Sequence, residues 1–153
     1  MSAPHKVECT LILKREYNAP VERVWRAWTD AKEMAHWYVA DASHVVHFAE
    51  ADVRVGGKYR VGFAPPGQTP YIEEGTYIEI VPLKKLVFRE SVSLNGEQLF
   101  SQMTTVSLRD LGGGRSEVTI TCTGVDTWRT GEGWTPALES LAHAAAGRYH
   151  VLR

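Results

Sequence analysis

The sequence lacks the features that define several large classes of protein. It has two cysteines, Cys9 and Cys122, and neither belongs to a CxxC or Cys/His pattern, which excludes a disulfide framework and the common zinc sites. No apolar run approaches the roughly 20 residues that span a bilayer, and residues 1–6 have no apolar secretion signal. We therefore expect a cytoplasmic protein with no membrane span, in which both thiols are reduced and packed.

The chain also has little net charge and no long run of basic residues. The net charge is −1 over 153 residues, and no run of Lys or Arg is longer than two residues, as at Lys84-Lys85. Recognition of a phosphate backbone requires a basic stripe or patch, so we expect no nucleic-acid partner.

The chain has none of the short motifs of common catalytic and cofactor sites. It contains no GxSxG, HExxH or P-loop sequence, and Gly112-Gly113-Gly114 is not followed by a helix pattern that could complete a phosphate site. His44 and His47 are three residues apart on an expected strand, which directs them to opposite faces. We expect no metal, no cofactor and no catalytic residue that a motif would identify.

What the sequence does contain is helical periodicity in two places. Near the C-terminus a single apolar stripe predicts one long helix that carries Trp134, Ala137, Leu138, Leu141, Ala142 and Ala145. Near the N-terminus, Pro20 suits the first position of a helix, and Asp30 suits the cap of a second, shorter one with Glu33 three residues later.

The rest of the chain is predicted to form strands. Residues 7–17 alternate as a half-buried strand does, and turn residues such as Asn95-Gly96 separate six further segments, 44–54, 57–63, 72–81, 85–93, 98–109 and 116–123. The connections are too short for parallel crossovers, so consecutive strands should pair antiparallel. We predict one α+β domain over residues 1–153, with a curved sheet of about seven strands wrapped around the long helix.

Four segments in this order resemble one family. The first segment is PVERVW at residues 20–25, followed by WTD at 28–30 and by Trp37, and the second is DVRVGGKY at 52–59. The third is GTYIEI at 75–80, followed by Pro82 and by LVF at 86–88. The fourth is Gly133-Trp134 with Leu138 and Leu141. Together they resemble the single-domain homologues of the activator of heat-shock protein 90 ATPase, within the START-like or SRPBCC superfamily. The resemblance implies a helix-grip fold with a hydrophobic cavity between the sheet and the long helix.

One position departs from the family pattern. Where relatives often place a Trp after the apolar run of the fifth strand, this chain has Glu90. Strand alternation puts Glu90 on the face of Leu86 and Phe88, and puts Gln102 on the matching face of the next strand, so that both could meet one ligand. A β-bulge in either strand would instead turn both side chains to solvent, and the sequence leaves these alternatives open.

The expected ligand cavity is aromatic with a few polar groups. Tyr77 and Glu79 are expected to share its face, whereas Glu73-Glu74 are interpreted as charges on the surface of the sheet. The residues expected to line it are Trp37, Tyr59, Val61, Tyr77, Phe88, Glu90, Phe100, Gln102, Trp134, Leu138 and Leu141.

Three functions are compatible with this cavity. The main hypothesis is binding of an apolar or amphipathic small molecule, such as a lipid, without a cofactor. The alternative is a cyclase or hydrolase that acts on a hydrophobic substrate in the same cavity, with Tyr77, Glu79 or Glu90 as acid or base. The third is a co-chaperone that stimulates the heat-shock protein 90 ATPase, as the family name implies.

Overall fold

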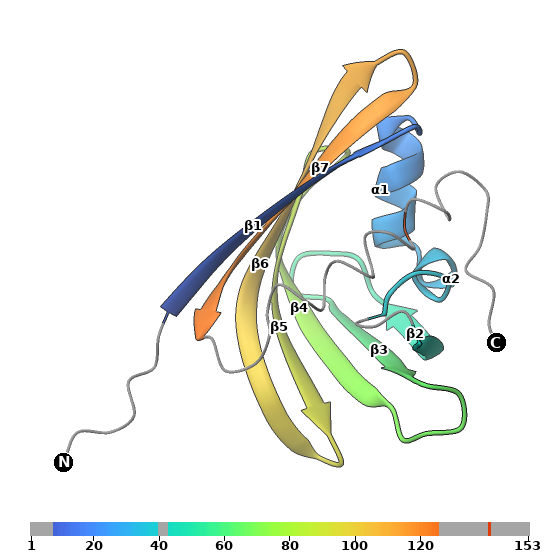
Figure 1. Ribbon diagram of the computed structural model, residues 1–153. Coiled ribbons are helices and arrows are strands. Elements are labelled where there is room, and N and C mark those ends of the chain that lie inside the picture. Colours follow the sequence, from blue (N-terminus) through green and yellow to red (C-terminus); the bar gives the residue numbers. More distant parts are fainter. Residues whose placement is uncertain (1–7, 40–42, 126–140, 142–153) are drawn as a thin grey trace.

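A seven-stranded antiparallel sheet that curls toward two short helices forms the frame of the computed structural model (Figure 1). The structure describes residues 8–39, 43–125 and 141. The strands lie in the order β1-β7-β6-β5-β4-β3-β2. Their bounds are β1 (Glu8–Tyr17), β2 (Val45–Ala51), β3 (Lys58–Ala64), β4 (Tyr71–Val81), β5 (Lys85–Leu94), β6 (Glu97–Gly112) and β7 (Arg115–Val125).

The predicted sheet is confirmed in strand number, direction and, to within a few residues, bounds. The long helix predicted from Trp134 onward lies outside the described residues, apart from Leu141, which is fully buried. None of the described helices has the length and apolar character needed to cross a bilayer.

The hairpin between β5 and β6 has the turn that its sequence predicts. Asn95 and Gly96 have φ values of 53° and 81°, both in the left-handed region. A two-residue hairpin turn of this kind favours Asn followed by Gly, because both central residues need positive φ. This turn sets the pairing that brings Glu90 opposite Gln102.

The two helices are joined through Asp30. Helix α1 (Val21–Thr29) begins one residue later than predicted, because Pro20 is the cap rather than the first helical residue. The Asp30 side chain accepts a hydrogen bond from the Lys32 amide and so caps α2 (Ala31–Met34). Glu33 pairs at 2.5 Å with Arg23 of α1, which ties the two helices together.

The helices pack on one face of the sheet, which we call the inner face. The Trp28 and Trp37 rings meet edge to face with centroids 4.6 Å apart, and the Trp37 indole N–H donates to the Ala27 carbonyl. These side chains belong to one buried cluster with alternate residues of the strands. The strand residues of this cluster include Tyr59, Val61, Phe63, Tyr77, Leu86, Phe88, Val106, Val118 and Ile120.

The two cysteines lie on neighbouring strands, two residues apart in register. Leu11 pairs with Cys122 and Cys9 pairs with Gly124 in the β1–β7 ladder. The Cys122 side chain is buried, and its sulfur lies 3.5 Å from the Thr104 hydroxyl.

A β-bulge changes the end of β4. The register with β5 shifts between Tyr77 and Glu79, which leaves Ile78 as the extra residue. Tyr77 stays on the inner face, but Glu79 turns to solvent and pairs with Lys85 at 3.3 Å. The prediction that Tyr77 and Glu79 share a face is therefore wrong, because the bulge inverts the alternation between them.

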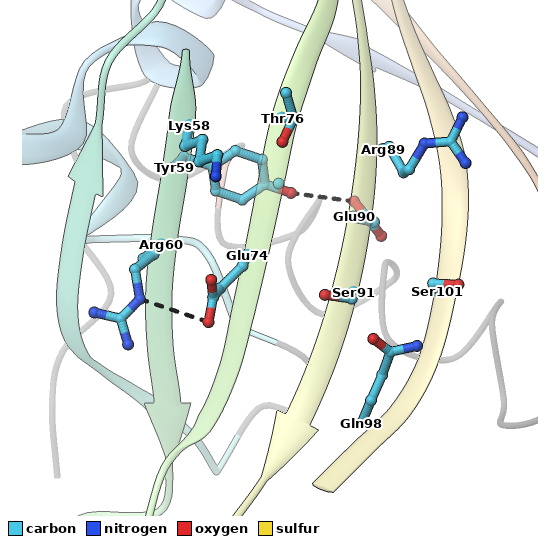
Figure 2. Close-up of a pocket in the computed structure, with 11 residues that line it drawn as sticks. Lys58, Tyr59, Arg60, Glu74, Thr76, Arg89, Glu90, Ser91, Gln98 and Ser101 are labelled. Carbon is cyan, nitrogen blue, oxygen red and sulfur yellow. Dashed lines mark hydrogen bonds and ion pairs between the residues drawn. The ribbon is translucent and has the colours of Figure 1, made fainter. Parts of the chain in front are cut away.

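A glycine in β4 makes room for a tyrosine from β3. Gly75 lies between Tyr59 and Glu90 in adjacent strands, and a Cβ atom at Gly75 would fall 2.0 Å from Tyr59 Cε1. Because Gly75 has no side chain, the Tyr59 ring can lie flat across β4 toward β5. Figure 2 shows this ring reaching over to Glu90.

We expect Gly75→Ala to destabilise the protein by about 1–3 kcal/mol, because the new methyl group must displace the Tyr59 ring in a packed interior. The free energy of unfolding in urea measures this loss. The control is the same substitution in a Tyr59→Leu background, where the ring is gone and the cost should shrink. Equal costs in the two backgrounds would contradict this account of Gly75.

Candidate functional site

Glu90 and Gln102 face each other on the inner face of the sheet. They are direct partners in the β5–β6 register, and the Gln102 amide nitrogen donates to Glu90 Oε1 at 2.5 Å. Glu90 is 2% exposed and Gln102 is 7% exposed. The β5–β6 bulge lies between Val92 and Ser93, beyond both residues, so the alternation is preserved and the solvent-facing alternative is excluded.

A second carboxyl group joins this pair from β4. Glu73 is buried on the inner face, diagonal to Glu90, and its Oε2 accepts hydrogen bonds from the Tyr38 hydroxyl and, at 2.6 Å, from the Tyr59 hydroxyl. The interpretation of Glu73 as a surface charge is therefore wrong; only Glu74, the next residue, is exposed and pairs with Arg60. We call Tyr38, Tyr59, Glu73, Glu90 and Gln102 the carboxyl cluster.

Burial dominates the electrostatics of the cluster. Desolvation raises the pKa of Glu73 from 4.5 to about 7, although the two tyrosine hydrogen bonds oppose the shift. Desolvation and the neighbouring Glu73 charge raise the pKa of Glu90 well above its ordinary value. Burial also raises the pKa values of Tyr38 and Tyr59, so both phenols stay protonated and act as donors.

The shift of the Glu90 pKa favours the protonated form of its carboxyl group. The Tyr59 hydroxyl lies 2.6 Å from Glu73 and 3.3 Å from Glu90, but a phenol has one proton to donate. The shorter contact uses that proton for Glu73. The two carboxyl groups are also hydrogen-bonded to each other, which lowers the pKa of Glu73 and raises the pKa of Glu90. None of the ion pairs among the described residues involves Glu73 or Glu90.

Aromatic rings surround the carboxyl groups. The Tyr59 ring is their centre, with centroid distances of 6.0 Å to Tyr38, 5.6 Å to Tyr77 and 5.5 Å to Phe88. Small-molecule sites usually have this composition, with a few polar groups enclosed by apolar surface.

The structure brings together most of the described residues that were predicted to line the cavity. Those with described side chains on the inner face are Tyr59, Val61, Tyr77, Phe88, Glu90 and Gln102, with Trp37 packed beneath Tyr38 at a ring distance of 4.9 Å. Phe100 pairs with Val92 in the β5–β6 ladder. Trp134 and Leu138 lie outside the described residues. Contact of any of these residues with a ligand stays a prediction.

Sequence reasoning missed two members of the carboxyl cluster. Glu73 is four residues before Tyr77, so the alternation that placed Tyr77 inward also places Glu73 inward, but the adjacent Glu74 suggested a surface pair. Tyr38 follows the second short helix, and nothing in the local sequence indicates that its hydroxyl reaches Glu73.

A depression of about 390 Å³ lies on the opposite, outer face of the sheet (Figure 2). Outward-facing side chains form most of its lining, and Tyr59 and Glu90 of the carboxyl cluster also border it. The outward-facing side chains include Lys58, Arg60, Glu74, Arg89, Gln98 and Ser101. Across the described part of the chain, no group of three or more His, Cys, Asp and Glu side chains is arranged to hold a metal ion.

The raised pKa of Glu73 predicts a loss of stability as the pH rises. Its pKa is about 7 in the folded protein and 4.5 in the reference state, so between these values the folded protein binds more protons than the unfolded chain. The free energy of unfolding should therefore fall with increasing pH across this window, by about 3 kcal/mol from this group. Urea unfolding of wild type and Glu73→Gln from about pH 4 to about pH 8 measures the difference.

The matched control for this measurement is Glu74→Gln, which changes the adjacent, exposed carboxyl group on the same strand. It should keep the wild-type pH dependence, whereas Glu73→Gln should flatten it. Parallel curves for wild type and Glu73→Gln would show that Glu73 ionises normally in the folded protein.

Comparisons with solved structures agree with this fold. Protein CV1439 from Chromobacterium violaceum is 30% identical, and the match covers 89% of this chain and 96% of that protein with a TM-score of 0.73. An AHSA1-like protein from Aeromonas hydrophila is 20% identical, over 90% and 93% of the two chains, with a TM-score of 0.71. DynU16, a putative protein in the dynemicin biosynthetic locus, is 19% identical over 96% of this chain and 50% of its own, with a TM-score of 0.69.

A comparison with curated proteins finds no match. The family model described as "Activator of Hsp90 ATPase homolog 1-like protein" matches residues 18–146, which is most of the chain. The resemblance drawn from the sequence is thus confirmed, and the chain belongs to the activator of Hsp90 ATPase homolog 1-like family.

Proposed function

We propose that this protein binds an apolar or amphipathic small molecule on the inner face of its sheet, in a cavity between the sheet and the C-terminal segment. The observation that carries the proposal is the carboxyl cluster, which combines two buried carboxyl groups and an amide with aromatic rings. The rings supply the apolar surface for the body of the ligand, and the cluster supplies hydrogen-bonding partners for one polar group.

The energetics of the cluster support a ligand-binding role. A carboxyl group that is buried without a cation costs stability, and its raised pKa records that cost. A core whose only role is packing would be more stable with apolar side chains at these positions. Strained or costly groups tend to occur at functional sites, which makes Glu73 and Glu90 candidates for contact with a ligand.

The comparisons are compatible with this proposal. DynU16 has a similar fold and comes from a locus for the biosynthesis of a small molecule, dynemicin. A shared fold does not carry function by itself, so the proposal rests on the cluster and takes only general support from this likeness.

Native mass spectrometry of freshly purified protein tests the proposal. We expect an additional mass of one bound small molecule that is lost on denaturation, and we expect the variant Glu90→Leu to carry less of it. Glu74→Gln, on the outer face, should retain the wild-type occupancy. A folded protein that carries no adduct and binds no apolar dye would contradict the proposed function.

The raised pKa of Glu73 favours catalysis as a second candidate function. A carboxyl group with a pKa of about 7 beside a second one whose pKa is also raised is an arrangement suited to general acid and base chemistry at neutral pH. In a hydrolase of this kind, Glu73 would accept a proton from water and Glu90 would donate one to the leaving group. The cyclase or hydrolase hypothesis therefore has a concrete pair of residues.

Turnover of nitrophenyl esters of medium-length acids tests the catalytic hypothesis. For a hydrolase, we expect the rate to rise as the pH passes about 7 and to fall roughly 100-fold in Glu90→Gln, because the acid is lost. The free energy of unfolding of the variant should be close to that of wild type. Turnover that survives in both Glu90→Gln and Glu73→Gln would exclude this pair as the catalytic groups.

The co-chaperone hypothesis is supported by the family description alone. Stimulation of the heat-shock protein 90 ATPase stays a prediction, as does any contact with a chaperone.

A further inference from the structure

The carboxyl cluster has more hydrogen-bond acceptors than donors. Each carboxyl group offers about four lone-pair positions. The donors directed at the two groups are the hydroxyls of Tyr38 and Tyr59, the Gln102 amide and the proton that the pair itself holds. The phenol protons are both committed to Glu73, so little donor capacity remains for a ligand.

An amide oxygen on the same wall also lacks a donor. Gln102 is 7% exposed, and its hydrogen bond to Glu90 uses the amide nitrogen. Among the described residues, the Gln102 amide oxygen accepts no hydrogen bond. This oxygen is not among the fully enclosed side-chain atoms that lack a partner, so it is an acceptor that a bound group could reach.

The surrounding side chains suit a positive charge. No ion pair among the described residues reaches Glu73 or Glu90, so no described cation offsets the negative charge that the pair acquires when it ionises. The faces of aromatic rings attract cations, and the Tyr59 ring is packed against those of Tyr38, Tyr77 and Phe88.

We propose that the polar group of the ligand is a protonated primary amine on an apolar body, and that the site rejects the corresponding carboxylic acid. This inference rests on the proposed function, since it names the chemical class of the molecule bound there. An ammonium group has three donors and no acceptor, which complements the free acceptors of Glu73, Glu90 and Gln102. A carboxylate would place a further negative charge against two buried carboxyl groups.

Proton release is a consequence of this binding mode. Among the described residues, the titratable groups that face the carboxyl pair are Tyr38 from the segment after α2, Tyr59 of β3 and Tyr77 of β4, and all three stay neutral near pH 7. An arriving ammonium group would favour the ionised form of both carboxyl groups, so the proton they hold would pass to solvent. Aliphatic amines have pKa values near that of Lys, about 10.4, so the ligand keeps its own proton.

Isothermal titration of the full chain with octylamine, octanol and octanoate tests the inference, since these probes share one apolar chain. At pH 7 we expect octylamine to bind roughly tenfold more tightly than octanol, and octanoate to bind most weakly. Titrations in two buffers of different ionisation enthalpy should show proton release with octylamine and none with octanol.

Two variants distinguish an effect of the carboxyl cluster on octylamine affinity from an effect of general surface charge. Glu90→Gln should lower the octylamine affinity roughly tenfold and leave octanol binding nearly unchanged. Glu74→Gln removes an exposed carboxyl group of the adjacent outer face and should leave both affinities at their wild-type values.

The outcomes distinguish this inference from the function on which it rests. Binding of octanol or octanoate as tight as that of octylamine would overturn the amine inference but leave the proposed small-molecule site intact. Equal loss of octylamine affinity in Glu74→Gln and Glu90→Gln would overturn it as well, by assigning the amine to surface charge. Failure of all three probes to bind the folded wild-type protein would count against both proposals.

Discussion

The burial of two carboxyl groups on one wall of the sheet is the constraint on which the site depends. Transfer of a carboxylate from water to a protein interior is unfavourable unless a partner compensates it. In this protein the partners are neutral: two phenols and an amide donate hydrogen bonds to Glu73 and Glu90. Neutral donors stabilise the charge less than a cation would, so the pKa values of both Glu73 and Glu90 are raised. The raised pKa values favour a pair that holds a proton near neutral pH.

The pleat and register of the sheet hold these groups together. Tyr59, Gly75, Glu90 and Gln102 occupy consecutive strands in one cross-strand row. Gly75 provides the space over which Tyr59 reaches the next strand, and the position of each bulge decides which residues point inward. A shift of one residue in β4 would send Glu73 to solvent and bring Glu74 inside, because side chains alternate between the two faces. The site is therefore a property of the register and does not belong to any one strand.

Alternation along the strands could be read from the sequence, and it predicted most of the sheet and three of the five residues of the carboxyl cluster. The alternation placed Glu90 and Gln102 on one face, and the structure has them in contact at 2.5 Å. It failed at Glu79, because a bulge depends on packing between strands and has no clear signal in one strand alone. Glu73 was missed for a different reason: two adjacent acidic residues suggested a solvated surface, although only one of them can face water in a strand. Tyr38 could not be placed, since its contact with Glu73 spans 35 residues and depends on how the helices dock.

Glu90 gives this wall a polar group at the position where the family pattern that the sequence resembles often has a Trp. A Trp at this position would present an indole with one donor and no acceptor, and the wall would be almost wholly apolar. Glu90 replaces that surface with a carboxyl group, and Gln102 stands directly opposite to hydrogen-bond it. The amide uses only one of its two polar atoms in this contact, so the exchange leaves an acceptor-rich face toward the interior. Because a hydrogen-bonding site rejects ligands that cannot satisfy its buried polar groups, this single position would select ligands by their donors as well as by their apolar surface.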